Sequence, residues 1–178
     1  IPVIKHKNIH PNLMQQEALA SLTALRNNHK NKALLISATG AGKTYLSAFD
    51  VKNIDPKRIL FVVHRENIAR DAMNTFKNII KNHTFGIFTG SDKDINSDYI
   101  FSTVQTIHKK EYREMFKPDT FDYIIIDEVH RAGADSYQKL MNYFTPNFLL
   151  GMSATPERSD NFDIYKMFDY NIAYEIRL

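Results

Sequence analysis

The residues best suited to chemistry lie in the segment Ser37–Thr44, which reads Ser-Ala-Thr-Gly-Ala-Gly-Lys-Thr. Gly40 and Gly42 permit a sharp turn and a close approach of the backbone to a ligand. An apolar run, Ala33–Ile36, precedes this segment, and a helical pattern, Tyr45–Val51, follows it. Backbone amides at a helix N-terminus carry positive partial charge and bind anions. The spacing therefore predicts a phosphate-binding loop. Its ligand-binding residues are Thr39, Gly40, Ala41, Gly42, Lys43 and Thr44.

Two side chains of this loop suit a bound nucleotide. Lys43 supplies a positive charge for the outer phosphates, and Thr44 supplies a hydroxyl for Mg²⁺. The pattern GxxxxGK[ST] is met except at its first position, where Ser37 stands in place of glycine. A glycine turn that carries a surface lysine is the alternative interpretation.

A second reactive pair follows the apolar run Tyr123–Ile126, where Asp127 and Glu128 are adjacent. A strand end projects the first carboxylate toward a metal ion, and the next carboxylate polarises a water molecule as general base. We therefore expect Asp127 to bind Mg²⁺ and Glu128 to orient the attacking water. With Lys43 they form the predicted catalytic set. Two acids that merely solvate a turn are the alternative.

A weaker signal is the segment Ser153-Ala154-Thr155, which follows the apolar run Phe148–Gly151. A small-residue turn ahead of a proline would explain it equally well in isolation. Its position downstream of the acids favours a functional role, because hydroxyl groups at Ser153 and Thr155 would be placed to form hydrogen bonds with His130. We expect these three residues to transmit the state of the nucleotide.

The elements that must position these residues follow from the apolar pattern. Runs such as Ile59–Val63 are apolar on both faces, which is typical of parallel strands covered by helices. The segment Glu66–Lys81 is an amphipathic helix by its spacing. Further helices are expected around Leu13–Leu25, Val104–Phe116 and Ser136–Phe144. The seven expected strands are Ala33–Ser37, Arg58–Val63, Thr84–Phe88, Tyr99–Ser102, Tyr123–Asp127, Phe148–Met152 and Ile172–Ile176.

This alternation predicts an α/β fold with an open, mostly parallel sheet of about seven strands and helices on both faces. Ligands of such sheets bind beyond the carboxyl ends of the strands. We expect residues 1–178 to form a single domain. Because the chain begins with Ile1 rather than Met, we expect it to be a piece of a longer protein.

The amino-acid composition limits the cellular compartment and the partners that we expect. The sequence has no cysteine, which excludes disulfides and cysteine-ligated metals and suits a reducing, cytoplasmic compartment. No apolar run approaches the roughly 20 residues that a membrane span requires, so no membrane partner is expected. The net charge of +3 is compatible with nucleic acid without being diagnostic of it.

Together these motifs resemble those of the first RecA-like domain of a superfamily-two DExH-box helicase or translocase, a P-loop NTPase domain. The family pattern AxTGxGKT corresponds to Ser37–Thr44, with serine in place of alanine. DExH corresponds to Asp127–His130 and SAT to Ser153–Thr155. The resemblance covers the chain from about Pro11 to its end and is nearest in style to bacterial motors like those of restriction enzymes. It implies ATP and Mg²⁺ as cofactors.

The resemblance also places weaker elements. Family members carry a glutamine that reads adenine ahead of the first strand, which corresponds to Gln15. The arginine, proline and tyrosine that precede it in the family are missing here, so Gln16 is a rival. Nucleic-acid contacts correspond to Arg65, Gly90 and Thr103, and backbone phosphates are engaged without reading sequence. A plain helix cap is an equal interpretation of Thr103.

The implied function is ATP hydrolysis coupled to movement on nucleic acid, with DNA more strongly indicated than RNA. The family uses a second RecA-like domain of the same polypeptide, which we expect to be absent from this chain, so the isolated piece is expected to hydrolyse ATP hardly at all. Three alternatives stay open. They are a translocase subunit of a restriction system, a P-loop kinase of a small substrate, and a nucleotide-responsive scaffold without hydrolysis.

Overall fold

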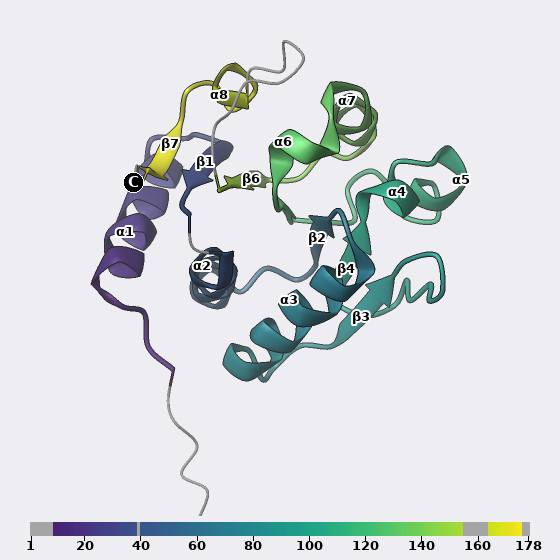
Figure 1. The fold of residues 1–178 in the computed structure, drawn as a ribbon, viewed down its shortest axis with the longest axis horizontal. Helices are drawn as coiled ribbons and strands as arrows, with labels where there is room; N and C mark the ends of the chain where they lie inside the picture. The colour runs from purple at the N-terminus through teal and green to yellow at the C-terminus, as the bar shows by residue number, and fades with distance from the viewer. Residues whose placement is uncertain (1–8, 39, 155–163, 176–178) are drawn as a thin grey trace, which may run out of the picture.

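One parallel sheet forms the centre of the molecule. The computed structural model describes residues 9–38, 40–154 and 164–175 (Figure 1). Seven strands lie in the order β3-β4-β2-β5-β6-β1-β7, and every pairing between neighbours is parallel. The predicted α/β fold, strand number and strand direction are therefore confirmed. The strands are β1 Lys32–Ile36, β2 Ile59–Val63, β3 Phe85–Phe88, β4 Tyr99–Thr103, β5 Tyr123–Ile126, β6 Phe148–Ser153 and β7 Ile172–Glu175.

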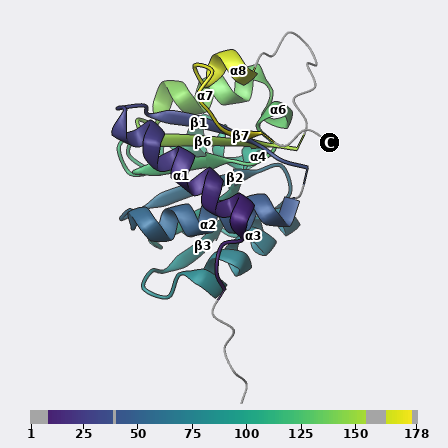
Figure 2. The same cartoon turned by 90° about the vertical axis from the view of Figure 1, so that its left-hand side faces the viewer.

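Helices cover both faces of the sheet, as expected. The first face carries α1 Leu13–Asn27, α2 Gly40–Ile54 and α3 Glu66–Ile79, whose apolar residues share one buried cluster. The second face carries α4 Val104–Ile107, α5 Lys110–Arg113, α6 Val129–Ala132, α7 Ala134–Tyr143 and α8 Ile164–Met167, which pack around a second cluster. Figure 2 shows α2 and α3 on the opposite side of the sheet from α7 and α8.

The two clusters divide the strand residues by alternation, as the period of a strand requires. In β2, Ile59, Phe61 and Val63 face the first cluster, whereas Leu60 and Val62 face the second. All five residues of β2 are buried, which explains why the run shows no polar positions. Each such side chain contributes about 1.5–3 kcal/mol through burial, so the sheet is a firm platform for residues at its edge.

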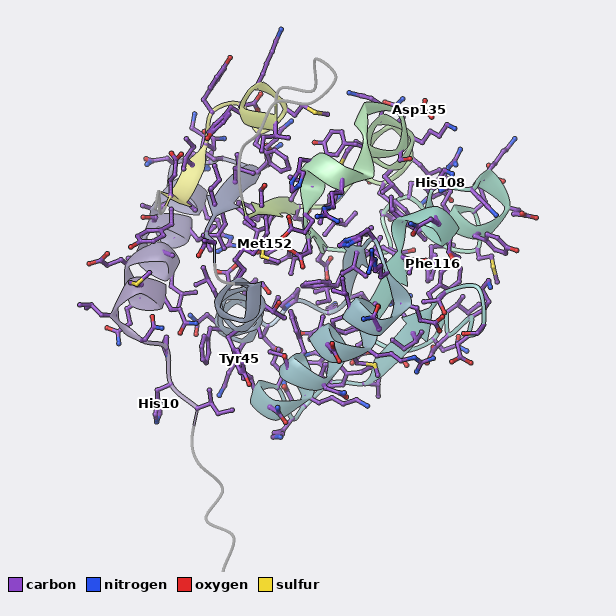
Figure 3. All side chains as sticks on the ribbon, in the orientation of Figure 1. His10, Tyr45, His108, Phe116, Asp135 and Met152 are labelled. Atoms are coloured by element: carbon purple, nitrogen blue, oxygen red, sulfur yellow. The ribbon has the colours of Figure 1, made fainter. Side chains whose placement is uncertain are left out.

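The prediction of one helix over Val104–Phe116 is wrong in one respect, because the structure has two short helices there, α4 and α5. The chain turns at Lys109, whose backbone is extended at φ −74° and ψ 133°. In one continuous helix, at about 100° per residue, Phe116 would point about 120° away from Val104. The break lets Ile107 and Phe116 enter the same buried cluster. Figure 3 labels Phe116 and His108, which precedes the turn.

Helix α2 starts earlier than its apolar pattern indicates. The pattern predicts a beginning at Tyr45, whereas the helix begins at Gly40 inside the phosphate-binding segment. Glycine has low helix propensity, which hid this first turn from sequence reasoning. The consequence is that Gly42, Lys43 and Thr44 belong to the rigid start of a helix rather than to a loose loop. Among the described residues, no helix is long and apolar enough to cross a membrane.

Candidate active site

The predicted motifs meet at one edge of the sheet because the strands that carry them are neighbours. Strand β1 pairs with β6, β6 with β5, and β5 with β2. Ile36 lies opposite Ser153, and Ile126 lies opposite Gly151. The carboxyl ends of these parallel strands therefore present the segment after Ile36, the acids after Ile126 and the end of β6 side by side.

Lys43 occupies the centre of this edge. Its side chain is only 1% exposed, and its Nζ lies 2.8 Å from Oε1 of Glu128 and 3.7 Å from Oδ1 of Asp127. Buried charges are tolerated only when they are paired, and the two carboxylates supply that pairing. Lys43 thus meets two acids that lie more than eighty positions further along the chain, as the motifs predicted.

Glu128 reaches Lys43 through an uncommon backbone conformation. Its φ of 50° and ψ of 51° lie in the left-handed region, which non-glycine residues adopt rarely and at a cost of about 1–3 kcal/mol. The Glu128 backbone N–H donates to Oδ1 of Asp127 at 2.9 Å, which stabilises the turn. Strain of this kind persists where surrounding contacts hold it, and it clusters at functional sites.

The two carboxylates differ in their electrostatics. Burial raises the pKa of Asp127 above its ordinary value, against the opposing charge of Lys43. Burial also acts to raise the pKa of Glu128, but the hydrogen bond and charge of Lys43 outweigh it and the net shift is downward. Glu128 is therefore held ionised, as a residue that accepts a proton must be.

His130 connects the acids to strand β6. Its Nδ1 lies 2.9 Å from Oγ of Ser153 and 3.6 Å from Oε2 of Glu128. Ser153 is fully buried, so its contact with His130 is fixed by the sheet. The predicted contact between these two motifs is present. Thr155 lies outside the described residues, as does Thr39 of the phosphate-binding segment.

A cleft of about 480 Å³ opens beside these residues and is lined by Thr44, Asp127, Glu128 and His130. Sequence reasoning missed three ionisable residues of its wall, which are His64, Asp71 and Arg131. His64 directly follows β2, so the rule that ligands bind beyond strand ends would have found it. Asp71 lies on α3, and no local signal marks it. Burial, together with the charges of Arg131 and Arg65, lowers the pKa of His64.

A smaller cleft lies between α1 and the phosphate-binding segment. Gln15 and Tyr174 line it together with Gly42 and Lys43. The Gln15 Nε2 group donates to the Gly42 carbonyl at 3.3 Å, and its Oε1 accepts from the backbone of Asn12 at 2.9 Å. Tyr174 was not predicted as a site residue.

Gln16, the rival for the adenine contact, lies elsewhere. Its side chain donates to the carbonyl of Pro11, outside the residues that form this cleft. Gln15 is therefore the glutamine beside the phosphate-binding segment.

The predicted nucleic-acid contacts lie at the ends of β2, β3 and β4. Arg65 is exposed ahead of α3, and Gly90 is exposed after β3. Thr103 is different, because it is 7% exposed and its Oγ1 lies 2.9 Å from Oγ1 of Thr106. Thr103 occupies the N-cap position of α4, as the alternative interpretation expected, but its side chain makes no capping bond to the helix.

Comparisons with known proteins give the family of the chain. The family described as "Type III restriction enzyme, res subunit" matches residues 8–158. The chain belongs to this family. It is the first RecA-like domain of a superfamily-two motor, of the type that restriction enzymes share with helicases.

Individual proteins that are similar to this restriction-enzyme-like motor agree with the family assignment. The chain is 32% identical over 168 residues to the Type I restriction enzyme EcoAI endonuclease subunit of Escherichia coli, a match that covers 84% of the chain and 20% of the relative. Further relatives come from yeasts and viruses, so the motor is not confined to bacteria.

Solved structures show the same fold. A nuclease-deletion mutant of the Type ISP restriction-modification enzyme LlaGI, in complex with a DNA substrate mimic, matches 95% of the chain with a TM-score of 0.71 and 20% identity. The SWI2/SNF2 ATPase core of Sulfolobus solfataricus, in complex with dsDNA, matches 96% with a TM-score of 0.69 and 15% identity. The chain spans 20% and 38% of these two chains.

Proposed function

We propose that the intact protein hydrolyses ATP and uses the energy to move along nucleic acid or to separate its strands. The observation that supports this most strongly is the convergence of Lys43, Asp127 and Glu128 at one sheet edge. A cation for the phosphates and a carboxylate that stays ionised are the two groups that phosphoryl transfer to water requires from a protein. A kinase of a small substrate has no need of the His130–Ser153 contact beside them.

The residues of the cleft fit Mg²⁺. Thr44 and Asp127 line the same cavity and offer the hydroxyl and carboxylate oxygens that Mg²⁺ prefers. Among the described residues, no group of three histidine, cysteine or acidic side chains could hold a metal by itself. That pattern suits an ion bound jointly by protein oxygens and nucleotide phosphates. When bound, Mg²⁺ would neutralise charge that develops on the phosphates.

The remaining roles follow from position. Lys43 and the backbone of residues 40–44 bind the phosphates, and Thr39 belongs to the same segment. Gln15 reads adenine from the neighbouring cleft. Glu128 orients the attacking water and accepts its proton. His130 and Ser153, with Thr155, pass the nucleotide state to the surface that contacts nucleic acid.

DNA is the favoured polymer. The supporting observations are the family's restriction-enzyme description and two similar structures solved with DNA or a DNA mimic. Arg65 and Gly90 contact the phosphate backbone in this proposal, whereas Thr103 acts through the placement of α4 because its hydroxyl is bonded internally. A translocase subunit of a restriction system is the specific version that the family match favours.

A second RecA-like domain of the same polypeptide completes the site. Residues 1–178 form one domain in this proposal, and the arginines that stabilise the transferred phosphoryl group come from the second domain. The short share of each relative that the chain covers supports this arrangement. The cysteine-free sequence supports a cytoplasmic location.

The test is phosphate release from the intact protein with single-stranded DNA, duplex DNA and RNA compared side by side. We expect hydrolysis that DNA stimulates more than RNA does. Glu128→Gln is the matched variant, and we expect it to lower release by at least about a hundredfold. Release that nucleic acid does not change would contradict the motor function. Release that is the same in Glu128→Gln as in the wild type would favour a scaffold without hydrolysis at this site.

A further inference from the structure

The loop of residues 89–93, which follows β3, contains a glycine that neither strain nor packing explains. Gly90 has no positive φ, whereas Gly133 has. A Cβ built on Gly90 would meet no atom within 4 Å. Because glycine is also chosen where a ligand approaches the backbone closely, the open space above Gly90 indicates a contact surface.

The hydroxyl groups of this loop are committed to one carboxylate. Oε1 of Glu66, in the first turn of α3, accepts from Oγ1 of Thr89 at 2.9 Å and from Oγ of Ser91 at 2.5 Å. Arg70, one turn along α3, donates to the same oxygen at 3.1 Å and to Oδ2 of Asp92 at 2.9 Å. These hydrogen bonds lower the pKa of Glu66, which keeps the carboxylate charged.

Three carbonyl groups of the loop accept hydrogen bonds within the loop itself. The ammonium of Lys93 donates to the carbonyl of Thr89 at 2.5 Å and to that of Gly90 at 3.1 Å. The Thr89 N–H donates to the carbonyl of Asp92 at 2.7 Å. Lys93 is itself placed over the ring of Tyr112, 4.8 Å from its centroid.

Two hydrogen-bond donors of the loop remain. Within the described part of the chain, the backbone N–H groups of Gly90 and Ser91 have no hydrogen-bond acceptor and lie next to each other along the chain. Successive backbone amides of this kind suit an anion. The hydroxyls of Thr89 and Ser91 already donate to Glu66, so the amides are the groups left to bind a phosphate.

We propose that Glu66 is a positioning residue for nucleic-acid binding, which fixes the loop of residues 89–93 so that the amides of Gly90 and Ser91 receive a backbone phosphate. This proposal rests on the proposed function and describes which residues form part of its nucleic-acid-binding surface. Arg65 immediately precedes Glu66, so the same helix start places an exposed cation and the loop at one edge of the sheet. Lys93 acts with Glu66 by fixing the opposite side of the loop.

The direction in which Glu66→Ala changes the affinity for DNA distinguishes a positioning role of Glu66 from a simple effect of its charge. Glu66 is an acid close to a predicted phosphate, so simple electrostatics predicts that Glu66→Ala would tighten binding. Positioning predicts the reverse, a weakening of about tenfold, which is the scale of one charge-assisted hydrogen bond. The measurement is the affinity of the intact protein for a mixed-sequence single-stranded DNA and for a duplex of equal length, by fluorescence anisotropy at several salt concentrations.

Asp119→Ala is the matched control. It makes the same change of net charge in an exposed turn ahead of β5, at the opposite edge of the sheet. We expect its affinity to equal that of the wild type. In phosphate release, we expect Glu66→Ala to raise the DNA concentration for half-maximal stimulation while the rate at saturating DNA is retained. A general structural defect would lower both.

Two further variants guard against misfolding of Glu66→Ala. Glu66→Gln keeps an acceptor oxygen and is expected to recover part of the affinity. Ser91→Ala removes one exposed donor to Glu66, and the double variant Glu66→Ala/Ser91→Ala is expected to bind no more weakly than Glu66→Ala alone, because both changes break the same link. Hydrogen exchange of residues 89–93 is expected to slow when DNA binds the wild type and to slow less in Glu66→Ala.

The outcomes separate the two proposals. Wild-type protein that binds DNA, with Glu66→Ala binding equally or more tightly, overturns the role of Glu66 and leaves the motor function standing. Additive losses in the double variant also overturn it. Wild-type protein that neither binds nucleic acid nor is stimulated by it overturns both.

Discussion

Lys43 is the residue on which the site depends, because its ammonium group is removed from water and held by acids. In the structure its nearest partner is Glu128, at 2.8 Å. In the proposed mechanism, a triphosphate that binds here would have to displace Glu128 from Lys43. Glu128 is also the carboxylate that orients the attacking water. The exchange would release Glu128 from Lys43 and free it to orient water. In the proposed mechanism, nucleotide binding and the release of Glu128 as general base would be linked through this one hydrogen bond.

This link gives a prediction for nucleotide affinity. Glu128→Gln removes the negative charge that competes with the phosphates for Lys43, so we expect ATP to bind about tenfold more tightly, the scale of one charge-assisted hydrogen bond. The measurement is titration of the intact protein with a fluorescent ATP analogue in the presence of Mg²⁺. Asp135→Asn, at an exposed position of α7, is the control. Unchanged or weaker binding by Glu128→Gln would show that the ion pair does not compete.

At the level of elements, a buried ion pair joins three of them on the first face of the sheet. Arg26 of α1 lies 2.5 Å from Oδ2 of Asp50 on α2, and Tyr123 of β5 donates to the same carboxylate at 2.7 Å. The guanidinium also lies over the ring of Phe148, 4.1 Å from its centroid. Because α1 carries Gln15 and α2 begins with the phosphate-binding segment, this contact fixes two parts of the nucleotide site relative to the sheet.

Removing one partner of that pair is expected to be costly. Arg26→Met keeps the apolar stem over Phe148 and leaves the carboxylate of Asp50, which is 3% exposed, without its cation. We expect a loss of roughly 2–3 kcal/mol in the free energy of unfolding, since a buried charge loses its partner. Urea denaturation of the 178-residue chain measures it. Lys139→Met, in an exposed pair with Asp135, is the control and is expected to change stability little.

A second element-scale contact predicts a pH dependence. Nε2 of His83 lies 2.5 Å from Asp55 after α2, and its Nδ1 lies 2.9 Å from Asp98 before β4. Burial would lower the pKa of His83, but the two acids outweigh it and raise the pKa above 6.5. The stabilisation is therefore complete below about pH 6.5 and is lost as pH rises through the folded-state pKa.

The measurement compares wild type with His83→Gln by urea denaturation at a series of pH values. We expect the difference in their free energies of unfolding to shrink from about pH 6 to about pH 8. His108→Gln, on the second face, serves as the control for a histidine without an acidic partner among its described contacts. A constant difference across this range would show that His83 does not gain its stabilisation from its charge.

At the level of the whole molecule, the second RecA-like domain that we propose would supply a further wall of the cleft beside Glu128. Arginine fingers raise phosphoryl-transfer rates by about 10³–10⁵ in related GTPases, and the proposed second domain would supply such arginines here. We therefore expect the 178-residue chain to bind ATP weakly and to hydrolyse it at least about a thousandfold more slowly than the intact protein does. Phosphate release from both, at equal concentration with saturating DNA, measures this. A fast ATPase in the isolated chain would contradict the two-domain proposal.

The amino-acid sequence by itself determined what depends on neighbours along the chain. The apolar runs predicted all seven strands to within one residue at each end, because most positions of a buried strand are apolar. The segments around Lys43 and Asp127 predicted phosphate and metal binding, since both kinds of binding require particular side chains at close spacing. The helix over Val104–Phe116 was predicted as one piece because periodicity does not reveal which cluster each apolar side chain will join.

Only the tertiary structure decided what depends on packing across the sheet. The packing of strands and helices set Glu128 against Lys43 and brought Gln15 rather than Gln16 to Gly42. It also joined Glu66 to a loop more than twenty residues away, which no local pattern signals. Such contacts arise because parallel strands collect their carboxyl ends at one edge, and strand order follows from long-range packing rather than from local sequence.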